Sequence, residues 1–190
     1  MSRFYWVRHG PTHAKSMVGW SDLPADLSDD AQIARLSAHL PGDALVISSD
    51  LIRARATADA LNGPRTRLPD DPNLREIHFG DWELQVFDKI PDQEHLRAFW
   101  ENPGDVRPPG GESWHEVSNR VSAGAARLLA AHPGRDIIAV AHFGAILTQV
   151  QQALEVTAYE AFAHRLDNLS VTELLWQGTR WHAQTINHLP

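Results

Sequence analysis

The stretch "RFYWVRHGPT" (residues 3–12) begins as an apolar run and ends in a basic pair followed by glycine and proline. Residues 4–7 are all aromatic or β-branched, and such side chains are enriched in strands. The run is continuously apolar instead of alternating with polar residues, which is typical of a strand covered on both faces. The sequence therefore predicts a buried strand whose carboxyl end presents Arg8 and His9.

Two later stretches repeat this pattern, "ALVIS" (44–48) and "DIIAVA" (136–141). Basic or imidazole side chains also follow these runs, at Arg53 and at His142. The carboxyl ends of neighbouring parallel strands in an open α/β sheet share one crevice. We therefore expect four side chains to meet there: Arg8, His9, Arg53 and His142. Such a positive pocket suits a small, doubly charged anion such as a phosphoryl group, which arginine binds with two N–H groups.

Amphipathic patterns between and after the apolar runs predict helices. The helix over 28–40 is expected to have Ser28 as its N-cap, and the helix over 114–131 follows a capping box formed by Ser113 and Glu116. The remaining predicted elements are helices over 51–61 and 92–101 and a C-terminal antiparallel hairpin around residues 177–178.

The order of these elements predicts the fold class. Strands that alternate with helices favour a three-layer α/β/α fold with a mostly parallel central sheet, and the hairpin adds an antiparallel edge. The length suits a single domain over residues 1–190. The stretch 64–112 is irregular apart from one short helix, and so long a connection usually has a function, such as covering a substrate.

Composition excludes several classes of function. There are 24 acidic and 17 basic residues, so the net charge of −7 opposes binding to nucleic acid or to anionic lipid. There is no cysteine, which excludes disulfides and thiolate chemistry. No stretch approaches the roughly 18 apolar residues of a membrane span, and the N-terminus matches a first strand better than a signal peptide. We expect a cytoplasmic protein with no membrane or nucleic-acid partner.

Seven motifs, in this order, resemble those of the histidine phosphatase superfamily, the group that contains cofactor-dependent phosphoglycerate mutase, and in particular its small phosphatase branch. They are "RHGPT" (8–12), "GWSDLPADLS" (19–28), "SSDLIRARATA" (48–58), "LREIHFGDWE" (74–83), "PGGES" (109–113), "AVAHFGA" (139–145) and "NLSVTEL" (168–174). The resemblance implies a phosphoglycerate mutase-like fold and hydrolysis of a small phosphorylated metabolite, with no cofactor and no metal.

The resemblance also implies a role for each of five residues. His9 matches the histidine that becomes phosphorylated, and Glu76 matches the acid/base glutamate. Arg8, Arg53 and His142 match the residues that bind the phosphoryl group. The implied chemistry is physically reasonable, because guanidinium groups near an imidazole keep it neutral and nucleophilic and also stabilise charge on the phosphoryl oxygens.

Four positions depart from the usual pattern of the family: Pro11, Lys15, Leu84 and Phe143. We expect Lys15 to add a cationic contact to substrate and Phe143 to narrow the pocket. Trp20 and Glu83 lie in loop motifs and are expected to border the pocket, and Glu83 is also the weaker competitor of Glu76 for the acid/base role. Arg55 is expected to be a surface residue.

Three other functions stay open at this point. The first is a phosphoglycerate mutase-type isomerase, although the mutases that this chain resembles are longer, with additional covering segments. The second is a phosphate-binding module without turnover, which the presence of both His9 and Glu76 disfavours. The third is a metal-dependent hydrolase that uses His9, His13 and His142, although the four-residue spacing of the first two falls in a predicted loop.

Overall fold

The computed structural model describes residues 1–190 and contains a six-stranded sheet with the order β3-β2-β4-β1-β5-β6. The strands are β1 (Ser2–Arg8), β2 (Leu45–Ser48), β3 (Thr66–Arg67), β4 (Ile137–Ala141), β5 (Val171–Trp176) and β6 (Trp181–His188). The pairs β3–β2, β2–β4 and β4–β1 are parallel, whereas β5 pairs antiparallel with both β1 and β6. The three apolar runs are therefore adjacent parallel strands, and the C-terminal hairpin forms the antiparallel edge, as predicted.

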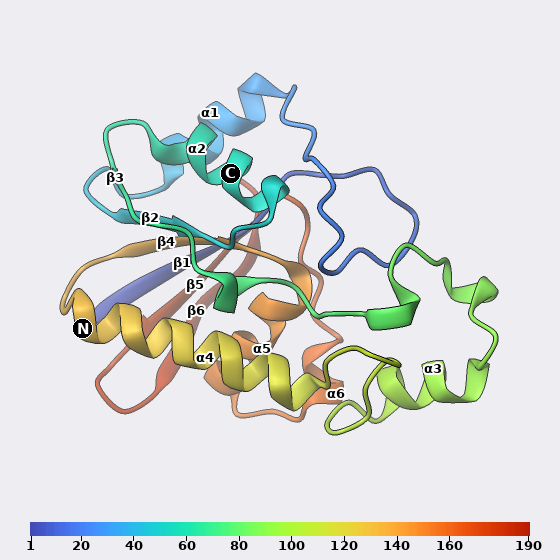
Figure 1. The fold of residues 1–190 in the computed structure, drawn as a ribbon. Coiled ribbons are helices and arrows are strands. Elements are labelled where there is room, and N and C mark those ends of the chain that lie inside the picture. Colours follow the sequence, from blue (N-terminus) through green and yellow to red (C-terminus); the bar gives the residue numbers. More distant parts are fainter.

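Helices cover both faces of this sheet (Figure 1). On one face lie α1 (Asp30–His39) and α2 (Ile52–Asn62), and on the other lie α4 (Trp114–Ala131) and α5 (Phe143–Leu154). Side chains alternate between the faces along each strand. In β1, Phe4 and Trp6 join the core cluster that includes α4 and α5, whereas Tyr5 and Val7 join the cluster that includes α1 and α2. Because both faces of these strands are buried, their sequences are continuously apolar.

Helix α1 starts later than the sequence suggested. The N-cap is Asp29, whose carboxylate accepts a hydrogen bond from the Gln32 backbone N–H at 2.9 Å. Ser28, the predicted N-cap, donates its hydroxyl and its backbone N–H to Asp26 instead. The N-cap prediction was therefore wrong by one residue, because three consecutive residues (28–30) are all good caps and an upstream carboxylate binds the first of them.

The other helices predicted from the sequence are present in the structure. The capping box of Ser113 and Glu116 is present with both of its hydrogen bonds at the start of α4. The short helix predicted within the irregular stretch is α3 (Gln93–Glu101). The same stretch also contains β3 and three short 3₁₀ turns, η1 (Pro72–Leu74), η2 (Gly80–Trp82) and η3 (Phe87–Lys89).

Two helices have no counterpart in the sequence-based prediction, α5 and the one-turn α6 (Ala158–Ala161). In α5, residues 144–150 are all buried. Its last turn, residues 151–154, reaches the surface. Its position matters, because α5 starts directly after β4 and its N-terminus therefore lies at the carboxyl end of the sheet.

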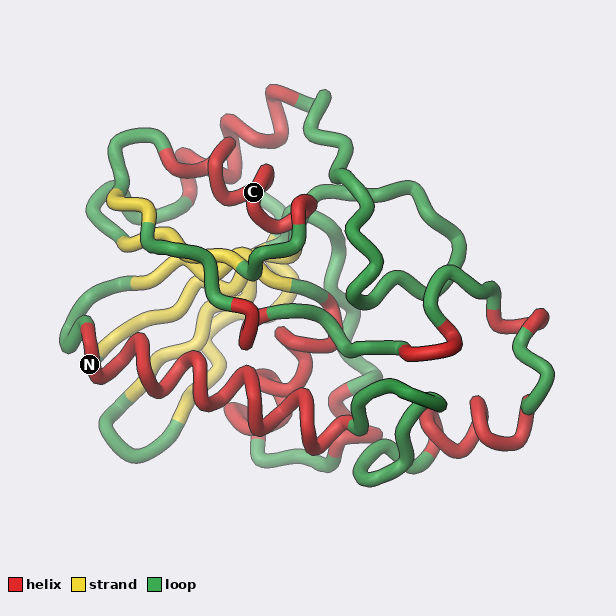
Figure 2. Tube along the Cα trace, in the orientation of Figure 1, coloured by secondary structure: helices red, strands yellow, loops and turns green.

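The long loops gather at this carboxyl end. Figure 2 shows the connection after β1 and the segment after η1 as extended loops on the side away from the N-terminus. The two loops contact each other, since the backbone N–H of Leu84 donates to Met17 and that of Met17 donates to Gln85. None of the helices combines the length and apolar character needed to cross a membrane.

Candidate active site

His9 lies at the carboxyl end of β1, in the centre of the sheet, with 6% of its surface exposed. Its backbone N–H donates to Ala141 of β4, and its carbonyl accepts from Asn168 Nδ2 at 2.8 Å. The ring Nδ1 lies 2.6 Å from the Gly10 carbonyl oxygen, which can only accept, so Nδ1 carries the proton. The other ring nitrogen, Nε2, is therefore unprotonated and carries a lone pair.

Arg53 directs a donor at this nitrogen. The fully buried Arg53 side chain donates from Nε to His9 Nε2 at 3.2 Å. Its two terminal nitrogens donate to the carbonyls of Ser21 at 2.9 Å and of Gly19 at 2.6 Å. The guanidinium is thus held between the carboxyl end of β1 and the loop that follows it, and its charge lies beside the imidazole.

His142 follows β4 and is fully buried next to His9, with 5.0 Å between the two ring centroids. Its Nε2 lies 2.6 Å from the hydroxyl of Ser49, a residue just beyond β2 that sequence reasoning did not single out. The other nitrogen, Nδ1, is buried without a hydrogen-bond partner in the protein. Buried polar groups usually have partners, so an unpaired one at a strand end indicates a place for a ligand.

Arg8 shows the same feature. One terminal nitrogen donates to the Leu166 carbonyl, whereas Nε is buried without a protein partner. The guanidinium lies 5.4 Å from the centroid of the Phe143 ring, within cation–π range. The predicted narrowing residue thus contacts Arg8 directly, at the first position of α5.

Glu76 binds to the N-terminus of α5. Its carboxylate accepts from the backbone N–H groups of Gly144 at 2.9 Å, Ala145 at 3.3 Å and Ile77 at 3.0 Å. A Cβ atom on Gly144 would lie 2.6 Å from the Glu76 carboxylate oxygen, so glycine is required for this approach. The Glu76 carboxylate can therefore bind the start of α5 only because glycine follows His142 and Phe143 at position 144.

Burial sets the protonation states of these groups. It lowers the pKa of His9 to about 3, with further lowering by Arg53 and Arg8 and an opposing effect of the Gly10 carbonyl. Burial, then Arg53, also lowers the pKa of His142 well below its usual value. Burial raises the pKa of Glu76, against the effect of the backbone N–H groups and the arginines. The site therefore combines neutral imidazoles with a carboxyl group that is protonated more readily than usual.

This arrangement predicts acid sensitivity of the fold. Because the pKa of His9 is about 3 in the folded state and about 6.5 in the unfolded chain, its contribution to stability is fully present above pH 6.5 and is lost as pH falls toward 3. Between pH 7 and pH 5 we expect His9 alone to reduce the free energy of unfolding by about 2 kcal/mol. The free energies of unfolding of the wild type and of His9→Gln can be measured by urea denaturation. Between pH 7 and pH 5 the loss should be about 2 kcal/mol smaller in His9→Gln than in the wild type. Between pH 8 and pH 7 the two proteins should change by the same amount. Equal losses between pH 7 and pH 5 would contradict the buried neutral state.

Glu83 and Trp20 lie in the loop layer around the site. The Glu83 carboxylate accepts from the backbone N–H groups of Gly19 and Trp20 at 3.0 and 2.7 Å, and from that of Phe79 at 3.2 Å. It thereby joins the loop after β1 to the segment that carries Glu76. The Trp20 indole N–H donates to the Glu76 carbonyl at 2.8 Å.

The structure places three other residues from the sequence analysis outside this cluster. Lys15 is exposed. His13 is also exposed and lies 2.7 Å from Asp26. Arg55 forms an exposed ion pair with Asp70 at 3.1 Å. Histidine, aspartate and glutamate side chains nowhere form a group of three or more with the arrangement of metal ligands.

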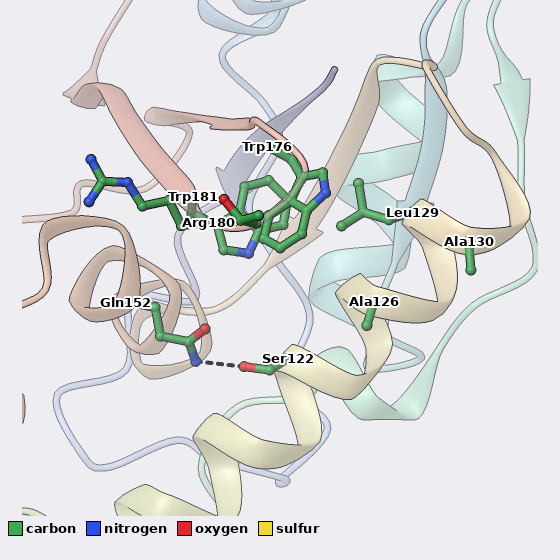
Figure 3. Close-up of a pocket in the computed structure, with 9 residues that line it drawn as sticks. Ser122, Ala126, Leu129, Ala130, Gln152, Trp176, Arg180 and Trp181 are labelled. Carbon is green, nitrogen blue, oxygen red and sulfur yellow. Dashed lines mark hydrogen bonds between the residues drawn. The ribbon is translucent and has the colours of Figure 1, made fainter.

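The largest cavity is separate from this cluster. It measures about 600 Å³ and lies between α4, the C-terminal part of α5 and the β5–β6 hairpin. Figure 3 shows Trp176 and Trp181 facing Leu129 of α4, with a hydrogen bond from Gln152 to Ser122 beside them. Its walls include none of the residues around His9, where the buried charged and polar groups gather.

Comparison with known proteins agrees with this geometry. The model of a family described as the histidine phosphatase superfamily (branch 1) matches residues 4–189. The chain belongs to the histidine phosphatase superfamily. A superfamily relative from Salmonella paratyphi C, named as a probable phosphoglycerate mutase, GpmB, is 31% identical over 191 residues, which cover 96% of this chain and 89% of that protein.

Solved structures of the superfamily share the fold over the whole chain. Bacillus stearothermophilus YhfR superposes with a TM-score of 0.91 at 26% identity, covering 100% of this chain and 98% of that one. A mycobacterial glucosyl-3-phosphoglycerate phosphatase, solved in complex with VO3, superposes with a TM-score of 0.85 at 29% identity, covering 97% and 98%. The phosphoglycerate mutase-like, three-layer fold that the sequence motifs predicted is thus confirmed.

Proposed function

We propose that this histidine phosphatase superfamily member hydrolyses a small phosphomonoester through a phosphohistidine formed on His9. The observation that carries the proposal is the His9 Nε2 lone pair, which lies in a buried site between Arg53 and His142. An imidazole held neutral at physiological pH is a competent nucleophile toward phosphorus. The unpaired Nδ1 of His142 and Nε of Arg8 supply further nitrogens for a phosphoryl group.

The first half-reaction follows from this placement. His9 Nε2 attacks phosphorus, the P–N bond forms, and the bond from phosphorus to the alcohol oxygen breaks. Protonated Glu76 gives its proton to the departing oxygen and becomes a carboxylate. The N–H groups of Gly144 and Ala145 stabilise that carboxylate, since they donate to it at the positive end of α5.

In the second half-reaction, water attacks the phosphohistidine. The Glu76 carboxylate takes the proton of the water, the P–N bond breaks, and neutral His9 and protonated Glu76 are restored. Throughout both steps, Arg8, Arg53 and His142 bind the equatorial phosphoryl oxygens. We propose that these arginines provide the positive charge that a metal ion supplies in other phosphatases. The mycobacterial phosphatase that this chain resembles was solved in complex with VO3, an oxyanion, which supports binding of a phosphoryl group here.

A mutase-type isomerase is the second candidate, because the curated relative from Salmonella paratyphi C is named as a probable phosphoglycerate mutase. A mutase must shield its phosphohistidine from water while a bound intermediate turns over. The segment 64–112, which includes the only helix of this region, α3, is short for such a cover. The similarity to a structure named as a phosphatase also supports hydrolysis.

One assay separates the two candidates. The enzyme is given 3-phosphoglycerate with catalytic 2,3-bisphosphoglycerate, and 2-phosphoglycerate and free phosphate are both measured, alongside a panel of simple phosphomonoesters. We expect phosphate release to dominate, and to persist after exhaustive treatment with EDTA. Sustained isomerisation with little phosphate release would establish the mutase. Loss of activity with EDTA, restored by zinc or magnesium, would indicate a metal-dependent hydrolase instead.

A further inference from the structure

Arg120, on the second turn of α4, contacts the backbone of the segment that carries Glu76. One terminal nitrogen, Nη1, donates to the carbonyls of Asn73 at 2.8 Å and Arg75 at 2.9 Å. The other, Nη2, donates to the carbonyl of Glu76 itself at 3.0 Å. One side chain thus binds three carbonyl groups within four consecutive residues.

Glu112, in the loop before α4, binds both this arginine and the far side of the same segment. Arg120 donates to its carboxylate from Nε at 2.9 Å and from Nη2 at 2.8 Å. The same carboxylate accepts from the His78 backbone N–H at 3.0 Å. All five N–H groups of the guanidinium are therefore used, and the two side chains are only 15% and 19% exposed.

The segment needs such support because regular structure provides none there. Residues 75–79 lie between η1 and η2, outside any helix or strand. The Glu76 carbonyl accepts from Arg120 and from the Trp20 indole, and the carboxylate accepts from the N-terminus of α5. The backbone and the side chain of Glu76 are thus fixed from different elements.

We infer that the Arg120–Glu112 ion pair is a positioning device for Glu76, which sets the place of its carboxyl group against the oxygen of the leaving group. This inference rests on the proposed function of Glu76. The device requires arginine, because the single ammonium group of lysine cannot bind three carbonyls and a carboxylate in one plane. A displacement of about 1 Å at a reacting group can lower the rate about 10²-fold, and we expect an effect up to this size when the ion pair is removed.

Arg127 provides a matched control on the same helix. It donates to Asp71 at 2.9 Å, near the same loop segment, but it is 55% exposed and contacts neither Glu76 nor its neighbours. If α4 arginines contribute only stability, Arg127→Met and Arg120→Met should affect catalysis in the same way. If Arg120 positions the acid, only its replacement should change the dependence of the rate on the leaving group.

The test compares the single-turnover rate of phosphohistidine formation from p-nitrophenyl phosphate, whose leaving group needs no proton, with that from glycerol 2-phosphate, whose leaving group does. This rate is chosen because kcat also includes the second half-reaction, in which Glu76 acts as the base for both substrates. We expect Arg120→Met and Glu112→Gln to lower the glycerol phosphate rate about 10- to 100-fold and the aryl rate less than about threefold, with the substrate concentration at half-saturation nearly constant. The glycerol phosphate rate of Arg120→Lys should lie between the rates of these two variants and that of the wild type. The double variant Arg120→Met/Glu76→Gln should be no more than about threefold below Glu76→Gln, because both act on one step.

The outcomes separate this inference from the proposed function. If Glu76→Gln shows the selective loss but Arg120→Met lowers both rates equally, the positioning role is wrong and the acid role stands. If Glu76→Gln itself shows no selectivity, both are wrong. If Arg120→Met does not fold, the ratio of the glycerol phosphate rate to the aryl phosphate rate in Glu112→Gln and Arg120→Lys tests the positioning role instead. Arg127→Met is expected to have the wild-type ratio.

Discussion

His9→Ala is expected to abolish turnover, with a loss of at least about 10⁴-fold in kcat, as found when a nucleophile that acts with its neighbours as a unit is removed. The loss follows from the position of Nε2, which is the unprotonated ring nitrogen of His9 and the one to which Arg53 donates. Rapid quench of the wild type with labelled substrate should trap a phosphoprotein that is labile in acid and stable in base. The alanine variant should trap none.

Two variants control this experiment. His13→Ala removes a nearby histidine that lies against Asp26, and Arg55→Ala removes a nearby arginine that pairs with Asp70. Both side chains are exposed and neither contacts His9, so both variants should retain nearly full activity. A His9→Ala enzyme that keeps more than a tenth of the wild-type rate would disprove the covalent mechanism, and a large loss in His13→Ala would revive the metal-dependent alternative.

Glu76→Gln is expected to have the second-largest effect, and to be selective. Glutamine cannot donate a proton to an alkoxide, so the rate for alkyl phosphates should fall by about 10²- to 10⁴-fold. Aryl phosphates should lose much less in the first half-reaction, because their leaving groups need little protonation. The measurement is the single-turnover rate of phosphohistidine formation with each type of substrate. Equal losses for the two types would show that Glu76 is not the acid in this step.

The same carboxyl group sets the expected pH dependence. Burial raises the pKa of Glu76, so the protonated form persists to higher pH than for an exposed glutamate. The alkyl phosphate rate should fall as pH rises through that pKa, because the acid form is lost. The fall cannot come from His9, which is already neutral well below that range with a pKa of about 3. A flat profile for alkyl substrates across the titration of Glu76 would contradict its role as the acid.

The strands could be predicted because burial on both faces leaves a direct mark on the sequence. For this reason the three parallel runs are apolar throughout at 4–7, 44–47 and 137–141, and all three are confirmed as neighbours. Helix α5 leaves a weaker mark, because residues 144–150 are buried on every side and its one exposed residue, Gln152, lies in the last turn. The two-residue strand β3 is too short to leave any pattern.

The candidate site was predictable where its residues directly follow strands or lie in a motif. Arg8, His9, Arg53 and His142 meet as expected because their strands are parallel neighbours. Their supporting partners were missed: Ser49 beside His142, Asn168 on the His9 carbonyl, and the pair of Glu112 and Arg120. Three of these lie in the quoted motifs, but a motif does not say which atom contacts which. Arg120 lies in none, and only the folded structure shows that its contacts lie 44 to 47 residues away.

The placement of β1 between β4 and β5 has a consequence for the newly made chain. Residues 2–8 are synthesised well before both of their lateral partners, 137–141 and 171–176. The strand that directly precedes His9 therefore stays an unpaired apolar segment while more than a hundred residues are added to the chain. Such long-range pairing slows folding and exposes the segment to aggregation in the meantime. The surroundings of His9 can consequently form only after β4 and β5 have been synthesised and have paired with β1 on either side.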